Sequence, residues 1–182
     1  MKTKVFAVRH GETDWNIKKC VQGRADRPLT KKGESDALKL AKDFKEKNID
    51  LIFSSQLKRS RKTAEIIGKV LGKEIQSTNA LNERDFGSLT GKTWEEIGEI
   101  DPKLSELDRK QQFNYRPFGG ESVEDVRKRI DEFLEFLEKK YPGKNILLIT
   151  HGGIIRLLKH LHHGELLAPY EIDNIGVYIF NL

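Results

Sequence analysis

Short apolar runs alternate with longer amphipathic segments along most of this sequence, and that alternation restricts the fold more than any other feature. Residues 5–8, 49–53 and 146–149 are almost continuously apolar over the length of a strand, which is typical of strands buried on both faces. Further strands are predicted at 74–81 and 176–180. The pattern therefore predicts an α/β fold, a three-layer sandwich in which a mostly parallel sheet is flanked by helices.

Capping residues mark where the predicted helices begin and end. Thr30 precedes one amphipathic segment and is a favourable N-cap. Ser122, with Asp125 three residues later, resembles a capping box at the start of another. Gly72 is well suited to end the helix that follows the second strand. A shorter helix is predicted at 93–100.

The length of 182 residues is that of a single domain. The region 84–118 is the least regular, because it combines glycines, prolines and short helical pieces. We interpret it as a short excursion from one domain spanning 1–182, and not as a second domain.

Composition and charge narrow the classes of function. Lys and Arg total 33 and Asp and Glu 28, a net charge of +5, and the charges lie mostly at the solvent-facing positions of predicted helices. No block of like charge stands out, and the aromatic residues are not interleaved with a basic stripe. We therefore expect no nucleic-acid binding. The apolar runs are too short to cross a membrane. An anionic small molecule is compatible with the excess of positive charge.

The sequence has no signal-peptide pattern near its start, and its single cysteine, Cys20, cannot form an internal disulfide. Both features favour a cytoplasmic protein. Cys20 lacks a nucleophile motif and is interpreted as an incidental thiol. Nothing in the sequence indicates the oligomeric state.

Two of the predicted strands end in similar tripeptides. The first runs into Arg9-His10-Gly11 and the fourth into His151-Gly152-Gly153. In a parallel sheet, ligands bind beyond the carboxyl ends of the strands. A single histidine at such a place is usually structural, but two of them predict a site at one edge of the sheet.

Arg59 and Glu83 also follow predicted strands. Arg59 falls in the first turn of a helix, where free N–H groups attract anions and a guanidinium would add a fork for phosphate. It could equally be a surface charge. Glu83 is either a general acid or a structural partner for an arginine, and its position in the sequence does not decide between them.

Several segments in the same order resemble the histidine phosphatase superfamily, which includes the cofactor-dependent phosphoglycerate mutases. A lone Arg-His-Gly is a weak signal, whereas the series covers nearly the whole chain. The matching segments are Arg9-His10-Gly11-Glu12-Thr13 with Trp15-Asn16, Gln22-Gly23, Leu29-Thr30 with Gly33, Ser54-Ser55 to Arg59 with Thr63-Ala64, Leu81-Asn82-Glu83-Arg84 with Phe86-Gly87, Gly120-Glu121-Ser122, and His151-Gly152-Gly153.

The resemblance implies a role for each catalytic position. His10 would attack phosphorus and become phosphorylated. Arg9, Arg59 and His151 would hold the phosphoryl oxygens, and Glu83 would protonate the leaving group and then activate water. These residue types suit phosphoryl transfer without a metal or another cofactor, because fixed positive groups meet the charge of the transferred group.

The resemblance also implies a set of substrate contacts. Phe86 stands where the mutases typically have tyrosine, so one hydroxyl contact is absent. The residues implied in substrate binding are Arg9, Thr13, Asn16, Gln22, Gly23, Arg59, Glu83, Phe86 and Gly152.

The sequence thus predicts a metal-independent phosphomonoester hydrolase acting on a small phosphorylated metabolite that the residues do not identify. One alternative is a cofactor-dependent phosphoglycerate mutase. It is disfavoured because 84–118 is short and the sequence stops just after the last predicted strand. A second alternative is a non-catalytic protein that binds phosphorylated ligands. The cluster His160, His162 and His163 is interpreted as a helix end and not as a metal site.

Overall fold

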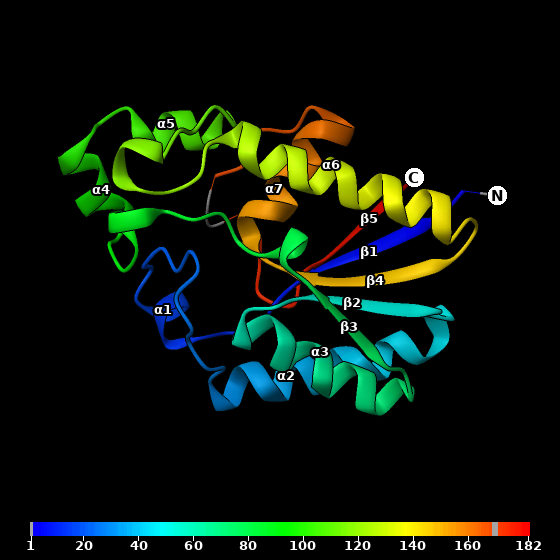
Figure 1. The fold of residues 1–182 in the computed structure, drawn as a ribbon. Coiled ribbons are helices and arrows are strands. Elements are labelled where there is room, and N and C mark those ends of the chain that lie inside the picture. Colours follow the sequence, from blue (N-terminus) through cyan, green and yellow to red (C-terminus); the bar gives the residue numbers. More distant parts are fainter. Residues whose placement is uncertain (1, 169–170) are drawn as a thin grey trace.

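The computed structural model describes residues 2–168 and 171–182, and it confirms the predicted three-layer α/β architecture (Figure 1). The strands are β1 (Lys4–Arg9), β2 (Leu51–Ser55), β3 (Ile75–Thr78), β4 (Asn145–Thr150) and β5 (Val177–Asn181). They form one sheet in the order β3-β2-β4-β1-β5. All neighbours are parallel except β5, which runs antiparallel to β1 at one edge.

Helices cover both faces of this sheet. Helices α2 (Lys31–Asp43) and α3 (Lys58–Leu71) lie on one face, and α6 (Val123–Lys140) and α7 (Gly152–His163) lie on the other (Figure 1). In β1, Phe6 and Val8 pack into the core beneath α2 and α3, while Val5 and Ala7 pack into the opposite core. Burial on both faces explains why the strands are continuously apolar.

The short helices gather at one end of the molecule. Helix α1 (Asp14–Ile17), α4 (Trp94–Ile100) and α5 (Leu104–Arg109) lie at the end where β1 and β4 finish (Figure 1). The helix predicted at 93–100 is confirmed as α4, whereas α1 and α5 were not predicted. Within 84–118, Phe86, Leu89 and Ile97 belong to the same core cluster as Val5 and Ala7.

The predicted caps are confirmed. The Thr30 hydroxyl accepts the N–H of Gly33 at 3.0 Å at the start of α2. Ser122 and Asp125 form a capping box at the start of α6. Gly72 ends α3 in the left-handed conformation, with φ of +63°, a backbone region that glycine enters without steric cost.

The third strand is shorter than predicted. The expected strand at 74–81 ends at Thr78, whose hydroxyl accepts the N–H of Ala80 at 3.2 Å and begins a 3₁₀ turn over Asn79–Leu81. The second strand also differs from the predicted 49–53, because it continues through Ser55. Ser54 and Ser55 therefore belong to the sheet, and both are buried.

Helix α6 packs one apolar side against the core. Val126, Ile130, Phe133 and Leu137 are buried along one side of it, at helical spacing. Across the part of the chain that the structure describes, no helix combines the length and the apolar character that crossing a bilayer requires.

Candidate active site

The two strand-end histidines meet at one edge of the sheet, as the sequence predicts. Strands β1 and β4 are neighbours, and Arg9 pairs in register with Thr150. His10 and His151 therefore emerge side by side, with ring centroids 5.1 Å apart. Their exposed fractions are only 3% and 0%. Both rings are thus held inside the protein within reach of a common ligand.

Hydrogen bonds determine which nitrogen of His10 carries the proton. Its Nδ1 lies 2.8 Å from the carbonyl oxygen of Gly11. A carbonyl oxygen can only accept, so Nδ1 carries the hydrogen in the neutral ring. Nε2 then has a free lone pair, which accepts the Nε–H of Arg59 at 3.2 Å. This tautomer is the one a nucleophilic Nε2 requires.

Two arginines, the buried Arg59 and the half-buried Arg9, flank His10 without acidic partners among the described residues. Arg59, in the first turn of α3 as predicted, donates to the carbonyls of Gly23 and Ala25, each at 2.7 Å. Arg9, at the end of β1, donates to the carbonyl of Ile172. Within residues 2–168 and 171–182, neither forms an ion pair with a carboxylate. The edge of the sheet therefore holds positive charge without a neutralising anion.

This environment changes the ionisation of His10 and Arg59. Burial, with the charges of Arg59 and Arg9, holds the pKa of His10 well below its usual range, so the ring is neutral at neutral pH. Burial and the neighbouring Arg9 lower the pKa of Arg59 to about 10, which leaves its guanidinium charged. A neutral nucleophile and two fixed cations are the components that phosphoryl transfer requires.

Glu83 lies at the same edge of the sheet, beside the start of α7. One of its carboxyl oxygens accepts the N–H of Gly153 and the other accepts the N–H of Arg84, both at 3.0 Å. Gly153 is required here for space, because a Cβ at that position would lie 2.3 Å from Oε1 of Glu83. The second glycine of His151-Gly152-Gly153 thus allows the carboxyl group to approach the start of α7.

A cavity of about 700 Å³ opens over these residues. Eight of the predicted site residues line it, together with Gly153: Arg9, His10, Asn16, Gln22, Arg59, Glu83, Phe86 and Gly152. His151 is fully buried and is not among the described residues that line the cavity. Trp15 and Trp94 line it as well, and the exposed Lys18 and Lys19 lie at its outer side. The volume is that of pockets for ligands of moderate size.

Two predicted contact residues, Thr13 and Gly23, are not among the described residues that line the cavity. The buried hydroxyl of Thr13 accepts the side-chain amide of Gln22 at 2.8 Å and donates to Asn16 at 3.0 Å. Gly23 contributes the carbonyl that holds Arg59. Both residues support side chains that do line the cavity, and the sequence pattern alone does not distinguish support from contact.

A buried ionic cluster that the sequence did not predict borders the cavity, which two of its members, Arg84 and Arg156, line. Asp108 on α5 pairs with Arg84 at 2.8 Å and with Arg156 at 2.5 Å. The hydroxyl of Tyr115 also donates to its carboxylate at 2.5 Å. Nothing in the sequence marked Asp108, because its short helix was not predicted and a lone aspartate is usually exposed.

Asn174 was also missed. Its side-chain amide donates to the carbonyl of His10 at 2.8 Å and to Asn16 at 3.2 Å. It lies between α7 and β5, in a segment without a helical or strand pattern, so no sequence signal pointed to it.

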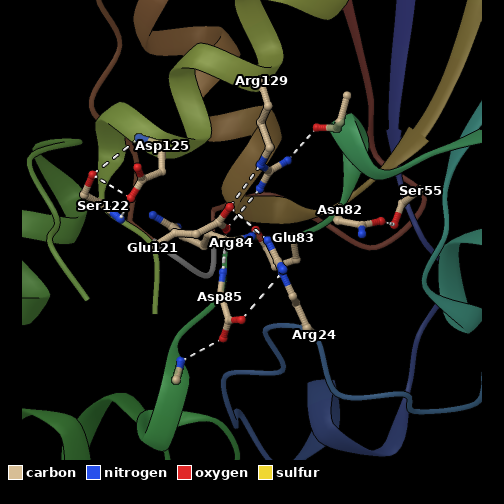
Figure 2. Close-up of polar contacts among 12 residues, drawn as sticks. Arg24, Ser55, Asn82, Glu83, Arg84, Asp85, Glu121, Ser122, Asp125 and Arg129 are labelled. Carbon is tan, nitrogen blue, oxygen red and sulfur yellow. Dashed lines mark hydrogen bonds and ion pairs between the residues drawn. The ribbon is translucent and has the colours of Figure 1, made fainter. Parts of the chain in front are cut away.

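Glu121, in one of the matching segments, joins three parts of the chain near the site (Figure 2). It accepts Arg24 at 2.9 Å, Arg129 of α6 at 3.3 Å and the N–H of Asp85 at 2.8 Å. The Asp85 side chain in turn pairs with Arg24 at 3.6 Å. The network fixes the segment that carries Glu83 against α6 and against the loop after α1.

The C-terminal histidine cluster lies away from the cavity. The rings of His162 and His163 pack against Phe180, with centroid distances of 5.3 and 5.8 Å. Across the described ranges, no three His, Cys, Asp or Glu side chains are grouped so as to hold a metal ion. Cys20, interpreted as incidental, lines the cavity.

Comparison with known sequences assigns the whole arrangement to one family. The profile of the histidine phosphatase superfamily (branch 1) matches residues 5–182. Among curated proteins, phosphoglycerate mutase-like protein 4 of Arabidopsis thaliana is 33% identical over 98% of this chain and 79% of its own length. The metal-independent phosphoserine phosphatase of the same plant is 35% identical, covering 99% of this chain and 76% of its own.

Comparison with solved structures gives the same result for the fold. A mycobacterial glucosyl-3-phosphoglycerate phosphatase, solved in complex with VO3, superposes with a TM-score of 0.84 at 26% identity. The match covers 97% of this chain and 91% of that structure. The relatives thus include proteins named as phosphatases and proteins named as mutase-like.

Proposed function

We propose that this chain, which belongs to the histidine phosphatase superfamily, hydrolyses small phosphomonoesters through a phosphohistidine on His10. One observation carries the proposal: Nδ1 of His10 is bonded to the Gly11 carbonyl, so Nε2 carries no proton, and its lone pair faces the guanidinium of Arg59, whose other hydrogen bonds go to carbonyl oxygens. A neutral nucleophile beside unpaired positive charge is suited to attack on an anionic phosphoryl group.

In the first step, Nε2 of His10 forms a bond to phosphorus and the ester P–O bond breaks. The departing oxygen takes a proton from Glu83, which lines the cavity beside the start of α7. Arg9, Arg59 and His151 stabilise the charge on the phosphoryl oxygens. Removing one such donor typically costs about 3–4 kcal/mol of transition-state stabilisation.

In the second step, water attacks phosphorus and gives up a proton to Glu83, while the P–N bond breaks and its electron pair returns to Nε2. The cycle consumes one water and restores both residues. Fixed positive groups supply the stabilisation, so none of these steps requires a metal ion.

Release to water is favoured over return to the substrate. The cavity of about 700 Å³ is open to solvent beside the exposed Lys18 and Lys19. A mutase, by contrast, must exclude water while the enzyme is phosphorylated. Two of the similar proteins are named as phosphatases. The proposed substrates are small phosphorylated metabolites, including phosphoserine and phosphosugars.

The nucleophile is tested by measuring phosphate release from p-nitrophenyl phosphate by His10→Ala. We expect activity to fall by about 10⁴-fold or more, because the nucleophile is lost. His160→Ala is the matched control, since that histidine lies outside the cavity. Unchanged release by His10→Ala would overturn the role of His10. A wild type that binds phosphate but never releases it from any ester would point to a non-catalytic binding protein.

The choice of acceptor is tested with 3-phosphoglycerate. We expect phosphate release and little conversion to 2-phosphoglycerate. Efficient conversion with little free phosphate would identify a mutase. A panel of phosphomonoesters assayed by phosphate release would then rank the substrate classes.

A further inference from the structure

The hydrogen bonds around His151 determine its tautomer, and it is the opposite of the His10 tautomer. Ser55, the last residue of β2, lies with its hydroxyl oxygen 2.8 Å from Nε2 of His151. The direction of that bond depends on where the single hydroxyl proton of Ser55 points. Figure 2 shows Ser55 bonded to Asn82, beside Glu83 and Arg84.

The backbone resolves this direction. The N–H of Gln56 donates to Oδ1 of Asn82 at 2.9 Å, so this oxygen, and not the amide nitrogen, faces β2. The same oxygen accepts the Ser55 hydroxyl at 2.9 Å. The N–H of Leu57 donates to the Ser55 oxygen at 3.1 Å. Because a hydroxyl has one proton and that proton goes to Asn82, Ser55 accepts from His151.

Nε2 of His151 therefore carries the hydrogen, and Nδ1 of the neutral ring has none. Nδ1 is buried and has no hydrogen-bond partner among the described residues. As a bare acceptor it repels a phosphoryl oxygen, and it becomes a donor only by taking up a proton. The His10 ring, 5.1 Å away between centroids, places a bound phosphoryl group beside it.

The surroundings of His151 keep its ring neutral. The pKa of His151 is held well below its usual range, first by burial and then by the charges of Arg59 on α3, His10 and Arg9. Arg129 on α6 lowers the pKa further, with the smallest effect of these groups. The carboxylate of Glu83, which also lies at this edge, is bonded to the backbone N–H groups of Arg84 and Gly153. A phosphoryl dianion that binds here brings negative charge next to His151 and so favours its protonated form.

We propose that Asn82 and Ser55 are positioning residues that hold His151 as the Nε2–H tautomer, so that binding of a phosphoryl dianion is coupled to uptake of one proton at Nδ1. The inference rests on the proposed phosphoryl site and adds its proton balance. One histidine is thus set to give an electron pair to phosphorus, and the other to take a proton as the anion arrives. Their opposite tautomers follow from one carbonyl, that of Gly11, and one hydroxyl, that of Ser55.

The tautomers are measured in the ligand-free protein, labelled with ¹⁵N-histidine, by long-range ¹H–¹⁵N NMR. We expect the Nδ1–H pattern for His10 and the Nε2–H pattern for His151, assigned by the peaks lost in His10→Gln and His151→Gln. A His151 with its proton on Nδ1 would overturn the inference, whatever the catalytic activity.

The proton balance is measured by calorimetric titration with inorganic phosphate at about pH 8, where the ligand is mostly a dianion, in buffers of different ionisation enthalpy. We expect net uptake approaching one proton per phosphate bound. Binding without uptake would overturn the inference and leave the proposed function standing. Absence of phosphate binding, with both tautomers as expected, would instead count against the proposed function.

Three variants separate positioning from structural support. Ser55→Ala removes the acceptor, so we expect mixed His151 tautomers and weaker phosphate binding. Asn82→Asp keeps an acceptor but adds negative charge. His151 should then already carry a proton on Nδ1 before phosphate binds, and proton uptake on binding should fall. Ser54→Ala is the matched control, because Ser54 is the neighbouring buried serine of β2 and bonds Ser77 at 3.1 Å. Equal effects of Ser54→Ala and Ser55→Ala would contradict the positioning role of Ser55.

Discussion

Two pairs of arginines line one cavity and differ in how their charge is balanced. Arg84 and Arg156 share the carboxylate of Asp108, which has 0% exposure. Arg59 is buried and Arg9 is half-buried, but their hydrogen bonds go to carbonyl oxygens and to His10. We call the first two the paired arginines and the last two the site arginines. The paired arginines support the wall, and the site arginines keep their charge for a ligand.

Ionisation reflects the same difference. Burial alone would raise the pKa of Asp108, but the paired arginines Arg84 and Arg156 outweigh burial and hold it below its usual range. Burial lowers the pKa of both site arginines, and the Glu83 charge offsets this only in part. An unbalanced buried charge costs stability, and an active site can tolerate that cost because the charge is used in binding.

The largest expected effect comes from removing the shared acid. Asp108→Asn leaves two buried guanidiniums without a counter-charge, so we expect a loss of about 3–5 kcal/mol in the free energy of unfolding. Urea denaturation followed by circular dichroism measures it. A loss comparable to that of an exposed pair, such as one produced by Asp125→Asn, would remove the distinction between the two groups of arginines.

Changing a site arginine should have the opposite balance of effects. Arg59→Met is expected to lower kcat/KM for p-nitrophenyl phosphate by about 10²–10³. Stability should fall by less than in Asp108→Asn, because the lost bonds go to carbonyls and no buried charge is left unpaired. Arg59→Lys should not restore the rate, since a lysine cannot hold both carbonyls and a phosphoryl oxygen. A variant with unchanged kcat/KM would contradict the comparison.

Tyr115→Phe weakens the paired group without removing a charge. Because the lost hydroxyl donates to the Asp108 carboxylate at 2.5 Å, we expect about 1.5–3 kcal/mol of lost stability, the range for bonds to charged groups. Both chemical denaturation and kcat should be measured, since kcat should change little. A larger loss of activity than of stability would mean that Asp108 acts on the reacting groups.

The last expected effect is a pH dependence that comes from the site. His10 and His151 have pKa values well below the usual one, so the unfolded chain binds more protons as pH falls below about 6.5. Stability is then full above that pH and is lost as pH falls, by up to about 1.4 kcal/mol per pH unit for each histidine. Melting curves across this range measure the slope, and His10→Asn with His151→Asn should reduce it. An unchanged slope would assign acid sensitivity to other groups.

The sequence predicts the site where the signal is local. His10 and His151 each follow an apolar run, and Arg59 lies at a helix start, so their positions at the edge of the sheet follow from neighbours in the chain. Thr13 and Gly23 show the limit, because their matching motif does not tell whether they contact the ligand or support Gln22 and Arg59. The separation depends on side-chain directions that only the folded chain has.

The sequence by itself determined the alternation of the longer strands and helices along the chain, the parallel core of the sheet and the family. These follow from hydrophobic periodicity, caps and motifs, which are carried by residues close together in the chain. Tertiary structure decided which buried arginines are neutralised, through the contact of Asp108 with Arg84 and Arg156. It also decided the opposite tautomers of the two histidines, because proton positions depend on hydrogen-bond partners that are brought together from distant segments.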